Sequence, residues 1–116
     1  MSTKPPTNGP GGPFSGDEAL AALLDLGWEL VETTEENVAV VFYPEWGETE
    51  YMDLDKPVFY GDPFFRIMSR RMVDRRLAGQ TYKAAIDARM KEIRDTIIRG
   101  RAEGGEAYRP AEGDPR

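Results

Sequence analysis

The sequence predicts an α+β fold: a short helix, a three-stranded antiparallel meander, and then a long C-terminal helix or helix pair, with extended N- and C-terminal tails. Three observations lead to this prediction. A helix-capping signal opens the folded part, a β-branched and aromatic run occupies its centre, and an apolar stripe of helical period closes it. The 116 residues suffice for one small domain. We expect a flexible Pro/Gly-rich arm over 1–14, a single domain over 15–99 and a flexible tail over 100–116.

The first helix is expected over 16–26. Ser15 and Glu18 form a capping box, in which each side chain accepts a hydrogen bond from the backbone of the other residue. Leucines and alanines give the segment one apolar face, and Gly27 supplies the C-terminal cap.

Three strands are expected next. Residues 28–32 alternate apolar with acidic side chains. Residues 38–43 are β-branched and aromatic, which is typical of a buried central strand. Residues 44–47 are turn-like, and 48–54 resume as a third strand. Short connections between consecutive strands predict an antiparallel meander.

The C-terminal half is expected to be helical. Asp62 and Pro63 mark its start, because Asp is a good N-cap and Pro is favoured at the first helical position. Gly79 interrupts the pattern. This half is therefore either two helices, over 63–78 and 81–99, or one bent helix.

An apolar stripe runs along the last helical segment. Its members recur at spacings of four, three and four: Ile86, Met90, Ile93 and Ile97. The stripe is too short for a coiled coil on its own, so we expect it to dock onto the sheet or onto a helix of another subunit. Arg99 followed by Gly100 is expected to end the helix.

Charge is divided unevenly along the chain. Between Asp17 and Asp55 there are twelve acidic residues and no Lys or Arg, whereas between Phe64 and Arg101 eleven basic residues face four acidic ones. Such a polarised molecule can pair head to tail with copies of itself or sit between unlike partners. Alternatively, the two halves fold against each other and neutralise internally, and the two interpretations are not exclusive.

Aromatic and arginine side chains are the candidate interface residues. Eight aromatic residues fall within 24 positions, more than a core of this size easily encloses, and exposed aromatics are common interface anchors. Arginine favours bidentate pairing with carboxylate or phosphate. The acidic half disfavours nucleic acid, so an acidic protein surface is the expected partner. The candidates are Trp46, Tyr60, Phe64, Arg66, Arg70, Arg71, Arg75, Arg76 and Arg94.

The composition argues against several function classes. The chain has no cysteine and no histidine, which excludes disulfides, thiolate metal sites and histidine-based catalysis. It also lacks calcium-loop spacing, phosphate loops and dinucleotide fingerprints. We therefore expect no catalytic, cofactor-binding or metal residues. No segment approaches the about 20 apolar residues of a membrane span, and no signal-peptide stretch opens the chain, so neither a membrane partner nor export by that route is expected.

The element order resembles one known family. The stretch 19–28, followed by the strands 38–43 and 48–54 and a helix, is similar to the HicA-like toxins, which are small RNases with a double-stranded-RNA-binding-like α-β-β-β-α fold. That family's catalytic residue is a histidine, which this chain lacks. The resemblance implies a catalytically dead regulatory module that binds nucleic acid or an acidic protein through its Arg-rich helix.

A second resemblance is one of composition. The Pro/Gly-rich segment 4–13, the segment 27–31 and the Gly/Arg-rich segment 99–105 look like those of small accessory virion proteins of actinobacterial tailed phages, such as minor tail or connector subunits. This resemblance implies a non-enzymatic structural subunit in the virion or the host cytoplasm. Its partners would be other virion subunits and copies of itself.

Overall fold

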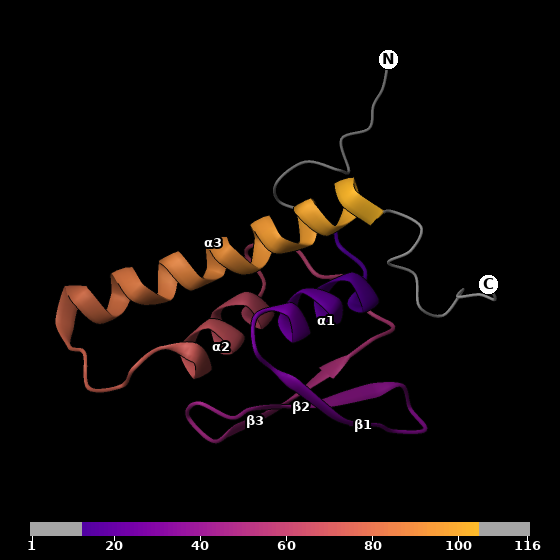
Figure 1. Ribbon diagram of the computed structural model, residues 1–116, viewed down its shortest axis with the longest axis horizontal. Coiled ribbons are helices and arrows are strands. Elements are labelled where there is room, and N and C mark those ends of the chain that lie inside the picture. Colours follow the sequence, from indigo (N-terminus) through magenta and orange to yellow (C-terminus); the bar gives the residue numbers. More distant parts are fainter. Residues whose placement is uncertain (1–12, 105–116) are drawn as a thin grey trace, which may run out of the picture.

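The computed structural model describes residues 13–104 (Figure 1). The elements in chain order are α1 (Gly16–Asp25), β1 (Glu29–Thr33), β2 (Val38–Tyr43), β3 (Glu48–Asp53), α2 (Pro63–Met72) and α3 (Gly79–Gly104). This order confirms the predicted α+β fold and selects the helix pair over one bent helix. Residues 1–12 of the predicted arm (1–14) and residues 105–116 of the predicted tail (100–116) lie outside the described residues.

The capping box predicted for α1 is present. The Ser15 hydroxyl accepts from the backbone N–H of Glu18 at 3.0 Å, and the Glu18 carboxylate accepts from the backbone N–H of Ser15 at 2.9 Å. Gly27, with φ of +110°, follows the last turn as expected, because this backbone region is open chiefly to glycine. Ala19, Ala22 and Leu23 are buried, so α1 presents one apolar face to the core.

The sheet has the strand order β1-β2-β3, and both neighbouring pairs are antiparallel. Val41 of β2 lies opposite Leu30 of β1 and Glu50 of β3. The register between β1 and β2 shifts between Leu30 and Glu32, which marks a bulge at Val31. β1 and β3 are therefore the two edges, and β2 is the protected central strand that its apolar sequence predicts.

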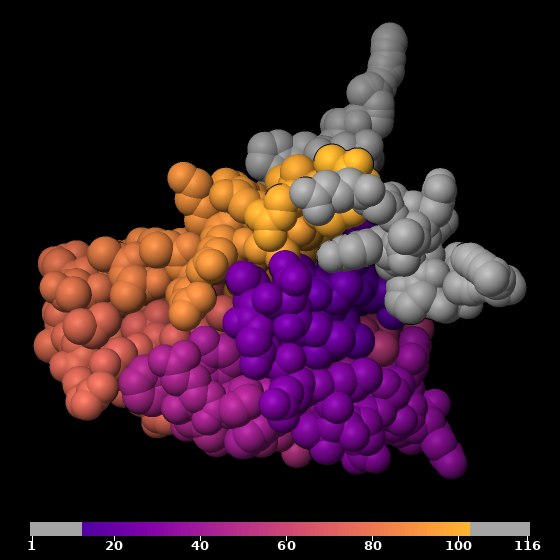
Figure 2. Space-filling view, viewed as in Figure 1, coloured from indigo at the N-terminus to yellow at the C-terminus, as the bar shows by residue number. Residues whose placement is uncertain are grey.

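Figure 1 shows the elements in layers. α1 and α2 lie between the sheet and α3, which runs across both of them. In the space-filling view, α3 covers the upper side of the molecule, and the strands reach the surface on the lower side (Figure 2). Fully buried side chains from all layers form one core, including Leu23, Val41, Phe65, Met68 and Ile93.

The apolar stripe of α3 is part of this core. Ile86 and Met90 are each 8% exposed, and Ile93 and Ile97 are fully buried. The stripe packs mainly on α1 and α2. The expected docking onto the sheet or onto another subunit is therefore wrong, because α1 and α2 already cover the inner face of the sheet.

The break between the two helices comes earlier than predicted. α2 ends at Met72, and residues 73–78 form the connection, so the expected helix over 63–78 is too long. Val73 is extended and buried, which turns the chain away from the helix. The Trp46 indole N–H donates to the Met72 carbonyl at 3.3 Å and satisfies a carbonyl that the ended helix leaves without a partner.

The predicted helix end at Arg99 is also wrong. α3 continues through Gly104, and Gly100 is buried within it. Arg101 holds these last turns in place, because its guanidinium donates to both carboxylate oxygens of Glu18, at 2.5 and 2.8 Å, and to the Pro13 carbonyl at 3.1 Å. A contact 83 residues away in the chain therefore overrides the local stop signal.

The folded domain begins one residue before the predicted boundary. Phe14 is fully buried, with its ring centroid 6.1 Å from that of Phe65. Its backbone exchanges two hydrogen bonds with Val58, each of 2.8 Å. Phe14 therefore belongs to the domain and not to a flexible arm.

Candidate protein-interaction surface

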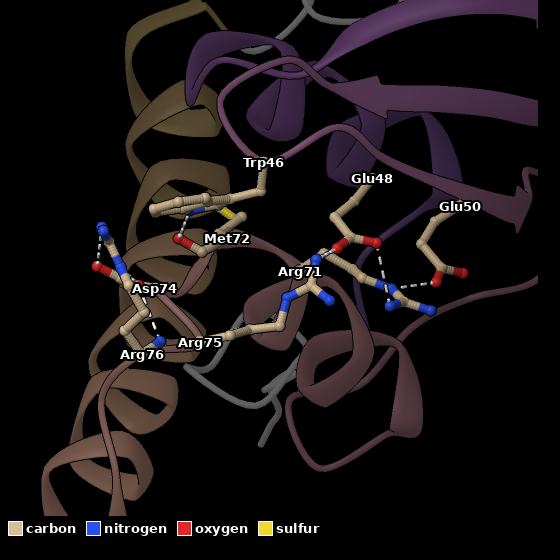
Figure 3. A network of polar contacts seen from close by, with 8 residues as sticks. All are labelled: Trp46, Glu48, Glu50, Arg71, Met72, Asp74, Arg75 and Arg76. Carbon is tan, nitrogen blue, oxygen red and sulfur yellow. Dashed lines mark hydrogen bonds and ion pairs between the residues drawn. The ribbon is translucent and has the colours of Figure 1, made fainter.

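The acidic and basic halves of the chain meet at the contact between β3 and α2 (Figure 3). Arg71 donates to Glu48 at 3.1 Å and to Glu50 at 2.6 Å. Arg75 pairs with the second oxygen of Glu48. The two glutamates lie two positions apart on one face of β3, and Arg71 offsets their mutual repulsion. Two of the predicted interface arginines are thus used within the fold.

A second meeting point joins α1 to α3. Burial acts to raise the pKa of Glu18, but hydrogen bonds from Arg101 and Ser15 outweigh it and hold this pKa below its usual value. Two residues earlier in α3, the Arg99 guanidinium lies 3.6 Å from the Asp25 carboxylate, with both side chains more than half exposed. Internal neutralisation, one of the two interpretations of the charge pattern, is therefore realised in part.

Trp46 lies in the β2–β3 turn and is half-buried (Figure 3). Besides its hydrogen bond to Met72, it carries the Arg76 guanidinium over its ring at 5.8 Å from the centroid. The Arg76 guanidinium also donates two hydrogen bonds to the Asp74 carboxylate, and these hydrogen bonds lower the pKa of that carboxyl. Trp46 and Arg76 thus hold the β2–β3 turn against the end of α2.

Tyr60 is likewise engaged within the domain. Its ring meets Phe65 edge-on, with the ring centroids 5.3 Å apart, and the Arg94 guanidinium lies over the Tyr60 ring at 4.8 Å from the centroid. Arg94 also bonds to Asp95 at 3.1 Å. Phe64 packs edge-on against Phe65 at 5.2 Å and remains half-buried, with part of its ring in a surface groove.

That groove lies between β3 and α2 and has a volume of about 270 Å³. Its apolar walls include Tyr51 and Met52 from β3, Pro57 from the connection, and Phe64 and Ile67 from α2. Tyr51 is 65% exposed and Ile67 is 37% exposed. Exposed apolar side chains that gather around a concave surface are typical of a binding site and not of a solvated face.

Lys56 is the basic residue among those that line the groove. Arg66 and Arg70 are exposed on α2, the helix that forms one wall, but they are not lining residues. Within residues 13–104, none of these three cations forms an ion pair. Arg66 and Arg70 are therefore among the basic residues of the 64–101 half that have no ion pair within the described residues.

Carboxylates also line the groove, but the fold already engages them. Glu50 is bound by Arg71. Asp62 accepts from the backbone N–H of Phe59 at 2.8 Å, and Asp53 accepts from the backbone N–H of Asp55 at 2.9 Å. The groove therefore offers a ligand apolar contact, together with one lysine and three carboxylates that accept hydrogen bonds from the fold.

The backbone of β3 adds a third kind of contact. The Leu54 N–H donates to the Asn37 carbonyl at 2.9 Å, and hydrogen-bonded pairs alternate along an antiparallel ladder. Counting from that pair, the backbone groups of Thr49 and Tyr51 point away from β2. Within the described residues, no backbone hydrogen bond from another element reaches them. An extended segment laid beside β3 can pair with these groups.

The predicted interface residues thus divide into three groups. Phe64 lines the groove, Arg66 and Arg70 are exposed on α2 without an ion pair among residues 13–104, and the other six are engaged in contacts within the domain. Sequence reasoning did not single out Tyr51, Ile67 and Lys56. A signal for Tyr51 exists, because it is an aromatic residue on the same strand face as Thr49 and Asp53, where a polar side chain is expected.

Comparison of the chain with protein-family models, with curated proteins and with solved structures gives no match. Among the helices that the structure describes, none is long and apolar enough to cross a membrane.

Proposed function

We propose that this chain is a non-catalytic interaction subunit that binds another protein chain through the groove between β3 and α2. One observation carries the proposal: exposed apolar side chains and an open strand edge coincide at one place. Both features suit an extended peptide segment. The backbone edge provides register, and the apolar wall provides contact area.

Two further observations support binding over catalysis and over nucleic acid. The carboxylates of the groove are held by donors of the fold, which leaves no poised acid–base pair there. Most arginines of the basic half are paired with acidic side chains, so a continuous cationic track for a phosphate backbone is not available. The assignment to a phage virion stays a prediction.

Site-specific photocrosslinking tests the proposal. Tyr51 is replaced by p-benzoylphenylalanine, which keeps an aromatic ring in the groove, and the full chain is irradiated in its native cell extract. We expect protein adducts from position 51, because the probe lies among the apolar side chains that a bound segment would contact. The control places the same probe at Thr81, an exposed position on α3.

The outcomes separate the candidates. Protein adducts from position 51 and not from position 81 support the proposal. Adducts with nucleic acid would favour the regulatory, nucleic-acid-binding alternative. Equal labelling from both positions, or no adduct from position 51, contradicts a binding role for the groove.

A further inference from the structure

We propose that the segment bound in the groove is a basic one: an extended stretch of a different protein in which apolar side chains alternate with lysine or arginine. This inference rests on the proposed function and names the chemistry of its partner. It begins from the charges of the groove, whose lining holds three carboxylates and one lysine. A cationic ligand complements that lining, in contrast to the acidic partner that the sequence predicts.

The three carboxylates differ in how far the fold neutralises them. Glu50 is bound by Arg71 at 2.6 Å, which offsets its charge. Asp53 and Asp62 instead accept from backbone N–H groups, and neither forms an ion pair among residues 13–104. A backbone donor favours the charged form of a carboxyl group without cancelling its charge. Two carboxylates without an ion pair thus outnumber the single lysine of the lining.

The register of β3 fixes which way each side chain of a bound strand points. Glu50 contacts Arg71 and Met52 is buried, so both face the helices, which lie together on one side of the sheet (Figure 1). Alternation along the strand places Tyr51 and Asp53 on the opposite face, called here the outer face. A residue paired with the open backbone of Tyr51 therefore also points to the outer face, and its two neighbours point to the α2 wall.

The outer face favours lysine or arginine. Besides Asp53 it carries Glu29 and Glu32, which lie across β2 from Thr49 and Tyr51. The three strands contain no Lys or Arg, so every charged side chain on this face is a carboxylate. A cation beside Tyr51 also meets an aromatic ring that is 65% exposed, and cations bind to such ring faces.

The α2 wall favours apolar side chains. Phe64 and Ile67 line it together with Pro57 of the connection. Arg66 and Arg70 are exposed on the same helix and have no ion pair among residues 13–104, so a basic side chain directed at this wall is repelled. The two sides of the groove therefore select a strand that is apolar on one face and basic on the other.

A strand from a second copy of this chain does not meet that requirement. Because β1, β2 and β3 contain no Lys or Arg, a second copy that paired one of its strands with β3 would place no cation beside Asp53. In the edge strands β1 and β3 it would instead bring further carboxylates, and like charges on neighbouring strands are destabilising.

Three synthetic peptides test the inference on the full chain. They are capped, about seven residues long, within the usual length of a strand, and alternate valine with lysine, glutamate or glutamine. Fluorescence anisotropy of the labelled peptides measures their affinities. At about 0.05 M salt we expect the lysine peptide to bind about tenfold more tightly than the glutamate peptide, and at about 0.5 M salt this ratio should fall below about threefold.

A charge-removing variant places the effect at the groove. D53N/D62N keeps a carbonyl oxygen at each position for the same backbone hydrogen bond. It should weaken binding of the lysine peptide about fivefold and leave the glutamine peptide within about twofold, which also shows that the variant is folded. The matched control E35Q/E36Q removes two charges from the exposed turn between β1 and β2, and should change neither affinity by more than about twofold.

Four results would overturn the inference. They are equal or tighter binding of the glutamate peptide, a lysine preference that survives D53N/D62N, a control that weakens binding as much as D53N/D62N does, and no binding of any peptide at about 1 mM. If the glutamate peptide binds more tightly while position 51 still yields protein adducts, the charge of the partner is wrong and the proposed function stands. Absence of adducts from position 51 contradicts the proposed function itself.

Discussion

Two buried hydroxyl groups on helices differ in their expected contribution to the stability of this fold. Ser69 of α2 is fully buried, and its Oγ has no hydrogen-bond partner among the described residues. Thr96 of α3 is 3% exposed, and its Oγ1 donates to the Glu92 carbonyl at 2.7 Å. A buried hydroxyl without a partner lowers stability, whereas one with a partner raises it slightly.

We therefore predict opposite effects for two conservative substitutions. Ser69→Ala should leave the free energy of unfolding unchanged or raise it by about 0.5–1 kcal/mol, because it removes an unsatisfied hydroxyl. Thr96→Val should lower it by about 1 kcal/mol, because it removes a satisfied hydroxyl at nearly constant volume. Urea denaturation of both variants measures the difference, and destabilisation by Ser69→Ala greater than that by Thr96→Val would contradict the assignment.

At the scale of elements, the contact between Glu18 and Arg101 joins the first turn of α1 to the last turns of α3. Its pH dependence has a definite sign. The pKa of Glu18 is lowered in the folded state, so the contact stabilises the fold above the pKa of the unfolded chain, about 4.3. This stabilisation is lost as the pH falls through the folded-state pKa.

We predict that Arg101→Gln lowers the free energy of unfolding by about 1.5–3 kcal/mol at pH 7, the size expected for hydrogen bonds to a charged group. The difference from wild type should shrink as the pH falls from the unfolded-chain value of about 4.3 through the lowered folded-state pKa of Glu18, because the carboxylate is then protonated in wild-type protein as well. Denaturant titrations across this pH range measure the effect.

Arg99→Gln is the control for that variant, because the Arg99–Asp25 pair lies on the same two helices but is exposed. Its effect should stay below about 0.5 kcal/mol at pH 7. Similar losses in both variants would show that the helix end, and not the contact with Glu18, determines the stability.

Most elements could be predicted from the sequence because local chemistry determines them. The capping box of Ser15, the stop at Gly27 and the β-branched run of β2 each act within a few residues. The predictions that were wrong depend on contacts between residues far apart in the chain. The burial of Phe14 depends on Val58, and the continuation of α3 past Arg99 depends on Glu18. No local pattern contains these partners, which lie more than 40 residues away in the chain.

The same limit applies to the candidate site. The sequence identifies arginines as a group, but pairing decides which of them remain available. Arg71 is paired with Glu48 and Glu50, whereas Arg66, five residues earlier on α2, has no ion pair within the described part of the chain. Only the packing of α2 against β3 distinguishes them, and only that packing creates the groove.

For the whole molecule, the arrangement of α3 predicts a single cooperative unfolding transition. α3 packs on both α1 and α2, so no helix can leave without exposing the shared core. Trp28 is 2% exposed and belongs to that core, so its fluorescence reports on the unfolding of the core. We predict that tryptophan fluorescence and far-ultraviolet circular dichroism give coincident denaturation curves.

Trp46→Phe isolates Trp28 as the single fluorescent tryptophan and should leave the two curves coincident. Separate midpoints would instead mean that the sheet and the helices unfold independently.

The hydrogen bond from Arg101 to the Pro13 carbonyl brings the two ends of the described chain together. The two ends of the described chain thus lie close together, so the contacts within the domain do not depend on where the chain is opened. A short linker between these ends, with a new opening in the exposed turn between β1 and β2, gives a circular permutant that retains every element and the β3–α2 groove. In that permutant β1 and β2 become the terminal strands, and β1 lies next to a chain end instead of being held between two turns.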